Sequence, residues 1–209
     1  MKPQNRQLSS DLPDLCARAV IGTLFLALAG RLGRDFVQTW RITDLLLLVG
    51  EGLVVVLTLL RRHASMVDRR AIVRIVTAAS MASPFLVRPG PVGGLTPETV
   101  NVMIASVGLV IVAAGKISLG YSFGLLPAHR GLVVGGIYRI VRHPIYLGYL
   151  VTHGAFLLSH PSLWNVVVMG GGDLALIARA LYEEQILARD AAYAQYCAAV
   201  KWRLWPGLY

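Results

Sequence analysis

The chain has 209 residues, of which 56% are hydrophobic and only 15% charged, and its formal net charge is +9. Soluble domains carry about 25% charged residues, so the composition excludes an ordinary soluble fold and predicts an integral membrane protein. The positive charge does not indicate a nucleic-acid partner, because the arginines lie between hydrophobic runs and no nucleic-acid-binding motif is present.

Six hydrophobic runs lie at residues 15–30, 43–60, 71–87, 98–119, 144–159 and 162–182. Each is near the length of about 20 residues that a helix needs to cross a bilayer, and none alternates as a strand would. The first run could be a signal peptide, but the charges on both sides of "LFLALAG" favour an uncleaved helix. If this run only lies on the membrane surface, five spans remain instead of six.

The connectors between the runs predict the topology. The segment "RPGPVGGLTPE" separates the third run from the fourth, and "SHPS" predicts a tight turn at residues 159–162, so that 144–182 form a helical hairpin. The longest polar connector is 120–143. Arginine and lysine are concentrated on the side that holds this connector and, with six spans, both chain ends, so we expect that side to be cytoplasmic.

Two charged residues of the last run are spaced for one helix face. Arg179 and Glu183 lie four residues apart, and their simplest role is a surface ion pair. A charge at the end of a membrane helix is costly, however, and usually has a function. The same face continues to the glycines at 170–172, which favours either contact with a lipid-like substrate or close helix packing.

The fifth run begins with polar residues. His143 precedes Pro144, which suits the first turn of a helix, where free N–H groups favour an anionic ligand. Tyr146 and His153 lie seven residues apart on one face; His153 is either a satisfied interior histidine or a functional group. The two cysteines, Cys16 and Cys197, are too far apart in sequence to indicate a disulfide framework or a metal site.

Three segments in order resemble the isoprenylcysteine carboxyl methyltransferase family: "GGIYRIVRHPIYLG", "RALYEEQIL" and "YAQYCAAVKWRLWPGLY". The resemblance covers residues 118–209 and predicts one integrated domain with N-terminal transmembrane helices at 1–117 and a catalytic region at 118–209. Two departures stand out. The family's Asn-Pro is Asn165 followed by Val166, and His129 is one residue away from the position at which some members carry a histidine.

The resemblance implies an all-α polytopic membrane bundle of about five or six helices, with a cytoplasmic pocket for S-adenosylmethionine formed by the C-terminal half. It assigns Arg179 to the substrate headgroup as the catalytic residue and implies no metal. The cofactor-binding residues that it implies are Leu132, Val133, Tyr138, His143, Pro144, Ile145, Tyr146 and Glu183.

Several substrates and functions are compatible with these features. The first hypothesis is methyl transfer to a lipophilic carboxylate such as a prenylcysteine-like group, because a carboxylate is already ionised and needs alignment rather than a strong base. A lipid amine is an alternative acceptor. An NADPH-dependent reductase of the sterol-reductase type and a non-enzymatic membrane protein are further alternatives. The partners of Glu51 and Asp173 inside the membrane cannot be named from sequence.

Overall fold

The computed structural model describes residues 66–68, 70–88, 94–124, 128–129 and 131–208, together with scattered helical positions between residues 19 and 60. Most of the first two hydrophobic runs, Glu51 and Arg130 therefore lie outside the described residues. Within the second run, residues 52–57 are helical, and Val54 and Leu57 pack against Phe123.

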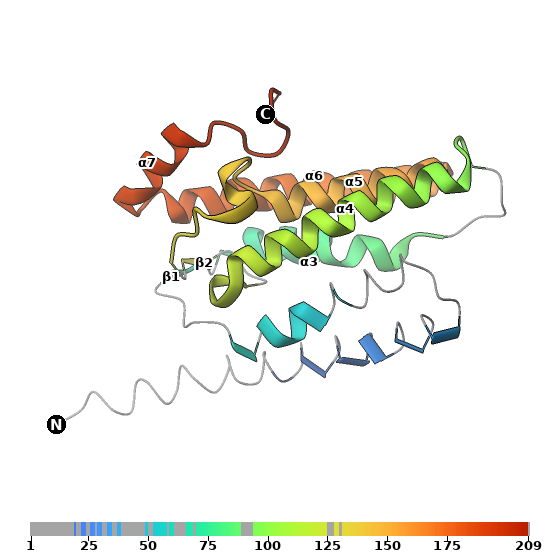
Figure 1. Ribbon diagram of the computed structural model, residues 1–209, viewed down its shortest axis with the longest axis horizontal. Coiled ribbons are helices and arrows are strands. Elements are labelled where there is room, and N and C mark those ends of the chain that lie inside the picture. The colour runs from blue at the N-terminus through green and yellow to red at the C-terminus, as the bar shows by residue number, and fades with distance from the viewer. Residues whose placement is uncertain are drawn as a thin grey trace.

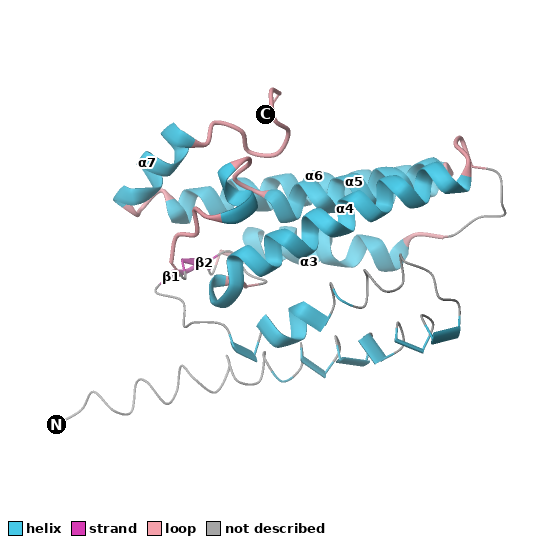
Figure 2. Cartoon of the chain, in the orientation of Figure 1, coloured by secondary structure: helices cyan, strands magenta, loops and turns pink. Residues whose placement is uncertain are grey.

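The described part of the chain is a helical bundle (Figure 1). Its long helices are α3 (Ala71–Leu86), α4 (Glu98–Leu119), α5 (Pro144–Ser159) and α6 (Leu163–Leu187), followed by the short α7 (Ala191–Ala199). Two short helical turns, η1 (Gly120–Ser122) and η2 (Gly136–Arg139), lie between α4 and α5. The strands β1 (Met66–Val67) and β2 (Ala128–His129) form one antiparallel two-residue ladder, which Figure 2 shows as the small strand element beside the helices. The predicted all-α class is confirmed for this part of the chain.

The helices follow the hydrophobic runs closely. The third to fifth runs match α3, α4 and α5, but α6 continues to Leu187, five residues beyond the predicted end at 182. The extension carries Glu183, Glu184 and Gln185, which hydropathy excludes from a run but which are good helix formers. Among the described residues, two segments are long and apolar enough to cross a bilayer, Glu98–Ser122 and Leu163–Leu187.

Glycines allow α4 and α5 to pack with their backbones close together. A Cβ on Gly108 would lie 2.7 Å from the Gly148 carbonyl oxygen, and a Cβ on Gly148 would lie 2.6 Å from that of Gly108. A Cβ on Gly115 would lie 2.6 Å from a side-chain carbon of Ile145, the second residue of α5. Such close approach is a common way for helices to associate in membranes. It fixes the start of α5, where the polar residues lie.

α6 packs chiefly against α3. Gly172 faces Ser83, and any Cβ at this glycine would collide with the serine side chain, whereas Gly170 and Gly171 have open space around them. The helix-packing interpretation of the glycine run is therefore confirmed at Gly172. At the other end of α6, Arg70 donates to Gln185 Oε1 at 3.0 Å and lies over the Tyr182 ring, which ties the start of α3 to the end of α6.

The predicted turn between α5 and α6 is confirmed, since α5 ends at Ser159 and α6 begins at Leu163. Asn165, at the position of the family's Asn-Pro, is fully buried and holds the turn to the end of α3. Its side chain accepts from the Arg88 amide at 2.9 Å and donates to the Arg88 carbonyl at 2.9 Å. Asn165 therefore joins the turn between α5 and α6 to the segment that follows α3, although the proline of the family pattern is missing.

Candidate active site

The loop before α5 places a tyrosine in the interior. Gly136 has a φ of +59°, a conformation that glycine adopts most readily, and a Cβ there would collide with Ser118 of α4. The turn η2 that begins at this glycine buries Tyr138. Two residues later the chain reaches Ile140 and then the His143–Pro144 start of α5. The glycine and proline of the motif therefore shape the loop that carries Tyr138 and His143.

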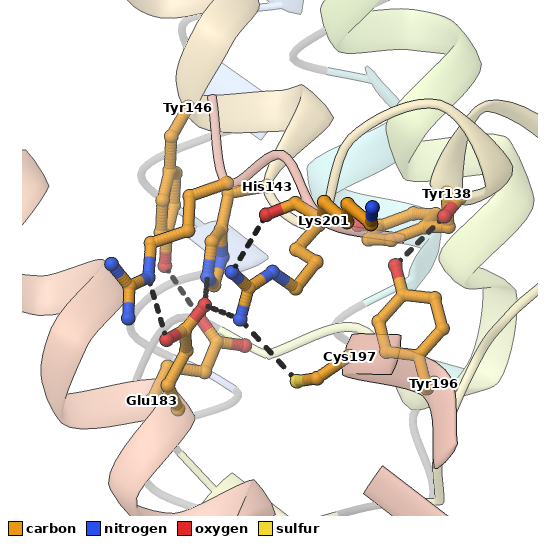
Figure 3. A network of polar contacts seen from close by, with 10 residues as sticks. Tyr138, His143, Tyr146, Glu183, Tyr196, Cys197 and Lys201 are labelled. Atoms are coloured by element: carbon orange, nitrogen blue, oxygen red, sulfur yellow. Dashed lines mark hydrogen bonds and ion pairs between the residues drawn. The ribbon is translucent and has the colours of Figure 1, made fainter. Parts of the chain in front are cut away.

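Four of the residues singled out in the sequence converge where the start of α5 lies beside the last turns of α6, far from the turn that connects the two helices. The rings of His143 and Tyr146 are stacked, with centroids 5.4 Å apart and planes 4° from parallel. Tyr146 donates its hydroxyl hydrogen to Glu183 Oε2 at 2.7 Å, and the Arg179 guanidinium carbon lies 5.3 Å from the centroid of the Tyr146 ring. Figure 3 shows the parallel rings above Glu183. Arg179 and Glu183 thus share one partner, Tyr146, and the common helix face predicted from their spacing is confirmed.

Glu184 is the charged centre of this region, and sequence reasoning missed it. Its Oε1 lies 3.2 Å from His143 Nε2 and 3.0 Å from Arg142 Nη1, and its Oε2 accepts from Arg203 Nε at 2.9 Å. One carboxylate therefore joins the loop before α5, the end of α6 and the C-terminal segment. The sequence did carry a signal, because the resemblance motif contains two consecutive glutamates.

Two adjoining hollows lie around these side chains. The larger contains about 520 Å³ of empty space and the smaller about 300 Å³, in both cases counting space that is open to solvent. The residues that line both are Leu119, Tyr138, His143 and Glu183.

The two hollows divide the predicted site residues between them. Leu132 and Val133 line only the larger hollow, and Ile145 and Tyr146 line only the smaller. Pro144 is buried at the helix start and lines neither of the two hollows, and Arg179 reaches the smaller one only through the Tyr146 ring. Arg142, Tyr193 and Tyr196 line the larger hollow as well, although sequence reasoning gave them no role there.

α7 supplies tyrosines to the wall of the larger hollow. Tyr196 donates its hydroxyl hydrogen to the Tyr138 carbonyl at 2.8 Å, which ties α7 to η2. Burial raises the pKa of Tyr196 to about 12 and raises the pKa values of Tyr138 and Tyr193 well above the ordinary range. These three phenols therefore stay neutral near pH 7 and can donate hydrogen bonds.

The helix start is less open to an anion than expected. The His143 amide donates to the Arg203 carbonyl, and the Arg142 amide donates to the Trp202 carbonyl, each at 2.9 Å. Pro144 has no amide hydrogen to offer. The His143 amide itself is therefore taken by the C-terminal segment, and an anion site in the first turn of α5 stays a prediction.

The intramembrane carboxylate Asp173 has a partner on α5. Its Oδ1 lies 2.5 Å from Nδ1 of His153, and the His153 ring stacks on Tyr149. Lys116 of α4 is buried and lies 5.8 Å from the Tyr149 ring. His153 is thus a satisfied interior histidine that links α5 to α6, as one of its two interpretations predicted.

Comparison with known proteins agrees with the resemblance. Residues 99–195 match the family described as phospholipid methyltransferase. No curated protein matches the chain at a significant level. The matched region runs from the first turn of α4 into α7. It contains His143, Tyr146, Arg179, both glutamates and every lining residue of the two hollows except Tyr196. Residues 99–195 of this chain are therefore similar to the phospholipid methyltransferase family, which includes the membrane methyltransferases similar to isoprenylcysteine carboxyl methyltransferase.

Proposed function

We propose that the protein is an integral membrane methyltransferase that uses S-adenosylmethionine and methylates the polar head of a lipophilic acceptor. The observation that carries this proposal is the pair of adjoining hollows with Tyr138, His143 and Glu183 in their common wall. A two-substrate transfer needs two neighbouring sites whose contents meet at one boundary. The family match supports methyl transfer rather than reduction by NADPH.

The larger hollow suits the cofactor. Its wall combines apolar side chains, Leu132 and Val133, with an acceptor-only carboxylate at Glu183 and neutral phenols on α7. This donor and acceptor set fits the adenine, ribose and amino-acid parts of S-adenosylmethionine. When bound, the cofactor supplies a methyl group on a positively charged sulfur. Glu183 and the ring of His143 would hold that end toward the smaller hollow and exclude water from it.

The smaller hollow suits an acceptor with an anionic group. Arg179 is 9% exposed, and its permanently charged guanidinium lies over the Tyr146 ring. A buried arginine can hold a carboxylate by a bidentate contact and orient one oxygen for in-line attack. A carboxylate is ionised near pH 7, so the residues of the site need only align it. We therefore favour a carboxylate such as a prenylcysteine-like group.

A phospholipid amine is the second candidate, and the family match is the observation that favours it. In this case Arg179 would pair with the lipid phosphate, and a carboxylate such as Glu183 would take the proton that the ammonium group must lose before attack. The two candidates therefore share Arg179 as an anion holder but differ in the atom that is methylated.

The experiment uses the full chain in membrane vesicles with S-adenosylmethionine carrying a labelled methyl group. A prenylcysteine analogue and phosphatidylethanolamine are offered separately, and the labelled product is treated with alkali. Alkali releases the label from a methyl ester as methanol but leaves an N-methyl group intact. Alkali-labile label on the prenylcysteine analogue supports the carboxylate, and stable label on the phospholipid supports the amine. No transfer to either acceptor contradicts both candidates.

We also propose that the hollows face the cytoplasm. The connector before α5 and the C-terminal segment lie at the same end of α6, and their arginines and lysines are typical of cytoplasmic loops.

A further inference from the structure

The C-terminal segment, residues 200–208, turns back from α7 toward the loop before α5 and ends beside the bundle (Figure 1). Val200 at its start is buried against α7, and Leu204, which is 3% exposed, packs in a core cluster with Ile145 and Leu147 of α5. Backbone bonds from the amides of Arg142 and His143 hold the segment in this place. The segment therefore lies against the first turn of a helix that runs into the bundle.

The opposite side of this segment exposes large apolar side chains next to positive charge. Trp202 and Trp205 are 38% and 44% exposed, and Leu208 is 81% exposed. Lys201 is exposed beside Trp202. The loop to which the segment is bonded adds two more exposed side chains, Arg139 and Ile140. Tryptophan together with lysine or arginine at the end of membrane helices is typical of the interface between lipid and water, where the indole lies at the level of the headgroups.

We propose that this surface, formed by Lys201, Trp202, Trp205 and Leu208, binds the headgroup layer of the leaflet in which α5 begins, with preference for anionic lipid. Two observations favour lipid as the occupant. The segment that carries this surface packs through Leu204 on α5 residues of the membrane bundle, and the charges of the surface are positive within a chain of net charge +9. Lysine and arginine near an anionic leaflet are attracted to it.

Binding of the segment to lipid is coupled to the candidate active site. The carbonyls of Trp202 and Arg203 accept the amides of Arg142 and His143, and Arg203 Nε donates to Glu184 Oε2 at 2.9 Å. Glu184 in turn lies against His143. A segment seated in the interface therefore holds His143 in the wall of both hollows. This coupling to activity rests on the proposed function, whereas the binding to lipid does not.

The experiment measures the depth of the two tryptophans in the full chain. The variant Trp40→Phe/Trp164→Phe keeps Trp202 and Trp205 as the only tryptophans and leaves the segment intact. It is reconstituted in phosphatidylcholine vesicles with and without phosphatidylglycerol, with bromine placed either high or low on the acyl chains. Acrylamide is the quencher in water. The matched control is Trp40→Phe/Trp202→Phe/Trp205→Phe, in which Trp164 at the opposite end of α6 reports alone.

We expect bromine near the headgroups to remove more than half of the emission, deep bromine to remove less, and acrylamide to remove little. Quenching by shallow bromine should fall at least twofold when phosphatidylglycerol is omitted or when Lys201→Gln and Arg139→Gln are introduced. Tryptophan emission that acrylamide quenches and bromine does not would overturn the proposal. The surface would then be one that binds a second copy of the chain or another protein. Equal quenching in neutral and anionic vesicles would overturn the preference for anionic lipid. The readout involves no cofactor, so it can fail or succeed independently of methyl transfer.

Discussion

Tyr146 donates its hydroxyl hydrogen to Glu183 Oε2 at 2.7 Å, and this bond joins the first turn of α5 to the last turns of α6. The same tyrosine ring stacks on His143 and lies against the Arg179 guanidinium. One phenol therefore sets the position of three residues to which the proposed function assigns separate roles. This arrangement makes the roles separable by substitution.

The hydroxyl of Tyr146 can be removed without removing its ring. Tyr146→Phe keeps the aromatic ring that stacks on His143 and lies under the Arg179 guanidinium, but removes the hydroxyl that donates to Glu183. A hydrogen bond to a charged group is worth about 1.5–3 kcal/mol, so we expect a measurable fall in the thermal midpoint and a cofactor dissociation constant raised about tenfold. Tyr149→Phe, one turn along α5, is the matched control. Equal effects of the two variants would contradict a special role for the Tyr146–Glu183 bond.

Substitutions of Arg179 and Glu183 should affect cofactor binding and methyl transfer differently, although the two residues lie one turn apart. Arg179→Ala should leave binding of S-adenosylhomocysteine nearly unchanged but lower single-turnover methyl transfer by about 10²-fold, because misplacement of a reacting group can cost that much. Arg179→Lys should recover only part of the rate, since lysine keeps the charge but loses the planar fork. Glu183→Gln should mainly weaken cofactor binding.

Both measurements are made on each variant in nanodiscs. Parallel losses of stability and activity in Arg179→Ala and Glu183→Gln would instead indicate a simple structural ion pair. Full turnover by Arg179→Ala would show that no anionic group of the acceptor is held at this position.

Glu184 should matter more for stability than Glu183 does. Glu184→Gln removes the negative charge that faces Arg142, His143 and Arg203, and leaves the two arginines close together with no carboxylate between them. Breaking a buried ion pair costs about 3–5 kcal/mol of unfolding free energy. Because Arg203 is partly exposed, we expect Glu184→Gln to lose about 2 kcal/mol. Chemical denaturation of Glu184→Gln and Glu183→Gln side by side measures the difference. A smaller loss for Glu184→Gln than for Glu183→Gln would contradict its role as the charged centre.

The hairpin of α5 and α6 should place its turn on the side of the membrane opposite the hollows. In a chain with Cys16→Ser and Cys197→Ser, a cysteine at Ser159 should react with an impermeant maleimide from one side, and a cysteine at Lys201 only from the other. The reason is that both helices run from the turn toward the end that carries the site. Labelling of both positions from the same side would refute this topology.

The sequence predicted α3 to α6 well, because each coincides with a continuous hydrophobic run bounded by proline, glycine or charge. The end of α6 was placed too early, since hydropathy stops at the charged residues while the helix continues through Glu183 and Glu184. The shared face of Arg179 and Glu183 followed from the period of the helix alone. The resemblance placed Tyr146 and Glu183 at one cofactor site, but the contact of Arg179 with Tyr146 was not predicted.

Contacts between distant segments could not be predicted. Neighbouring glutamates at 183 and 184 point in directions about 100° apart, and only the packing of α5 and the C-terminal segment decides which partner each one meets. The pairing of His153 with Asp173 depends in the same way on the offset between α5 and α6. The return of the C-terminal segment onto the His143 amide depends on backbone bonds that side-chain patterns do not encode.

The most direct test of the central claim is calorimetric titration of the purified chain in nanodiscs with S-adenosylhomocysteine and, separately, with NADPH. The account predicts saturable binding of S-adenosylhomocysteine at one site per chain and none of NADPH. His143→Ala, which removes the ring from the wall of both hollows, should raise the dissociation constant about tenfold, or about 1.4 kcal/mol. Saturable binding of NADPH with no binding of S-adenosylhomocysteine would contradict the account and favour a reductase.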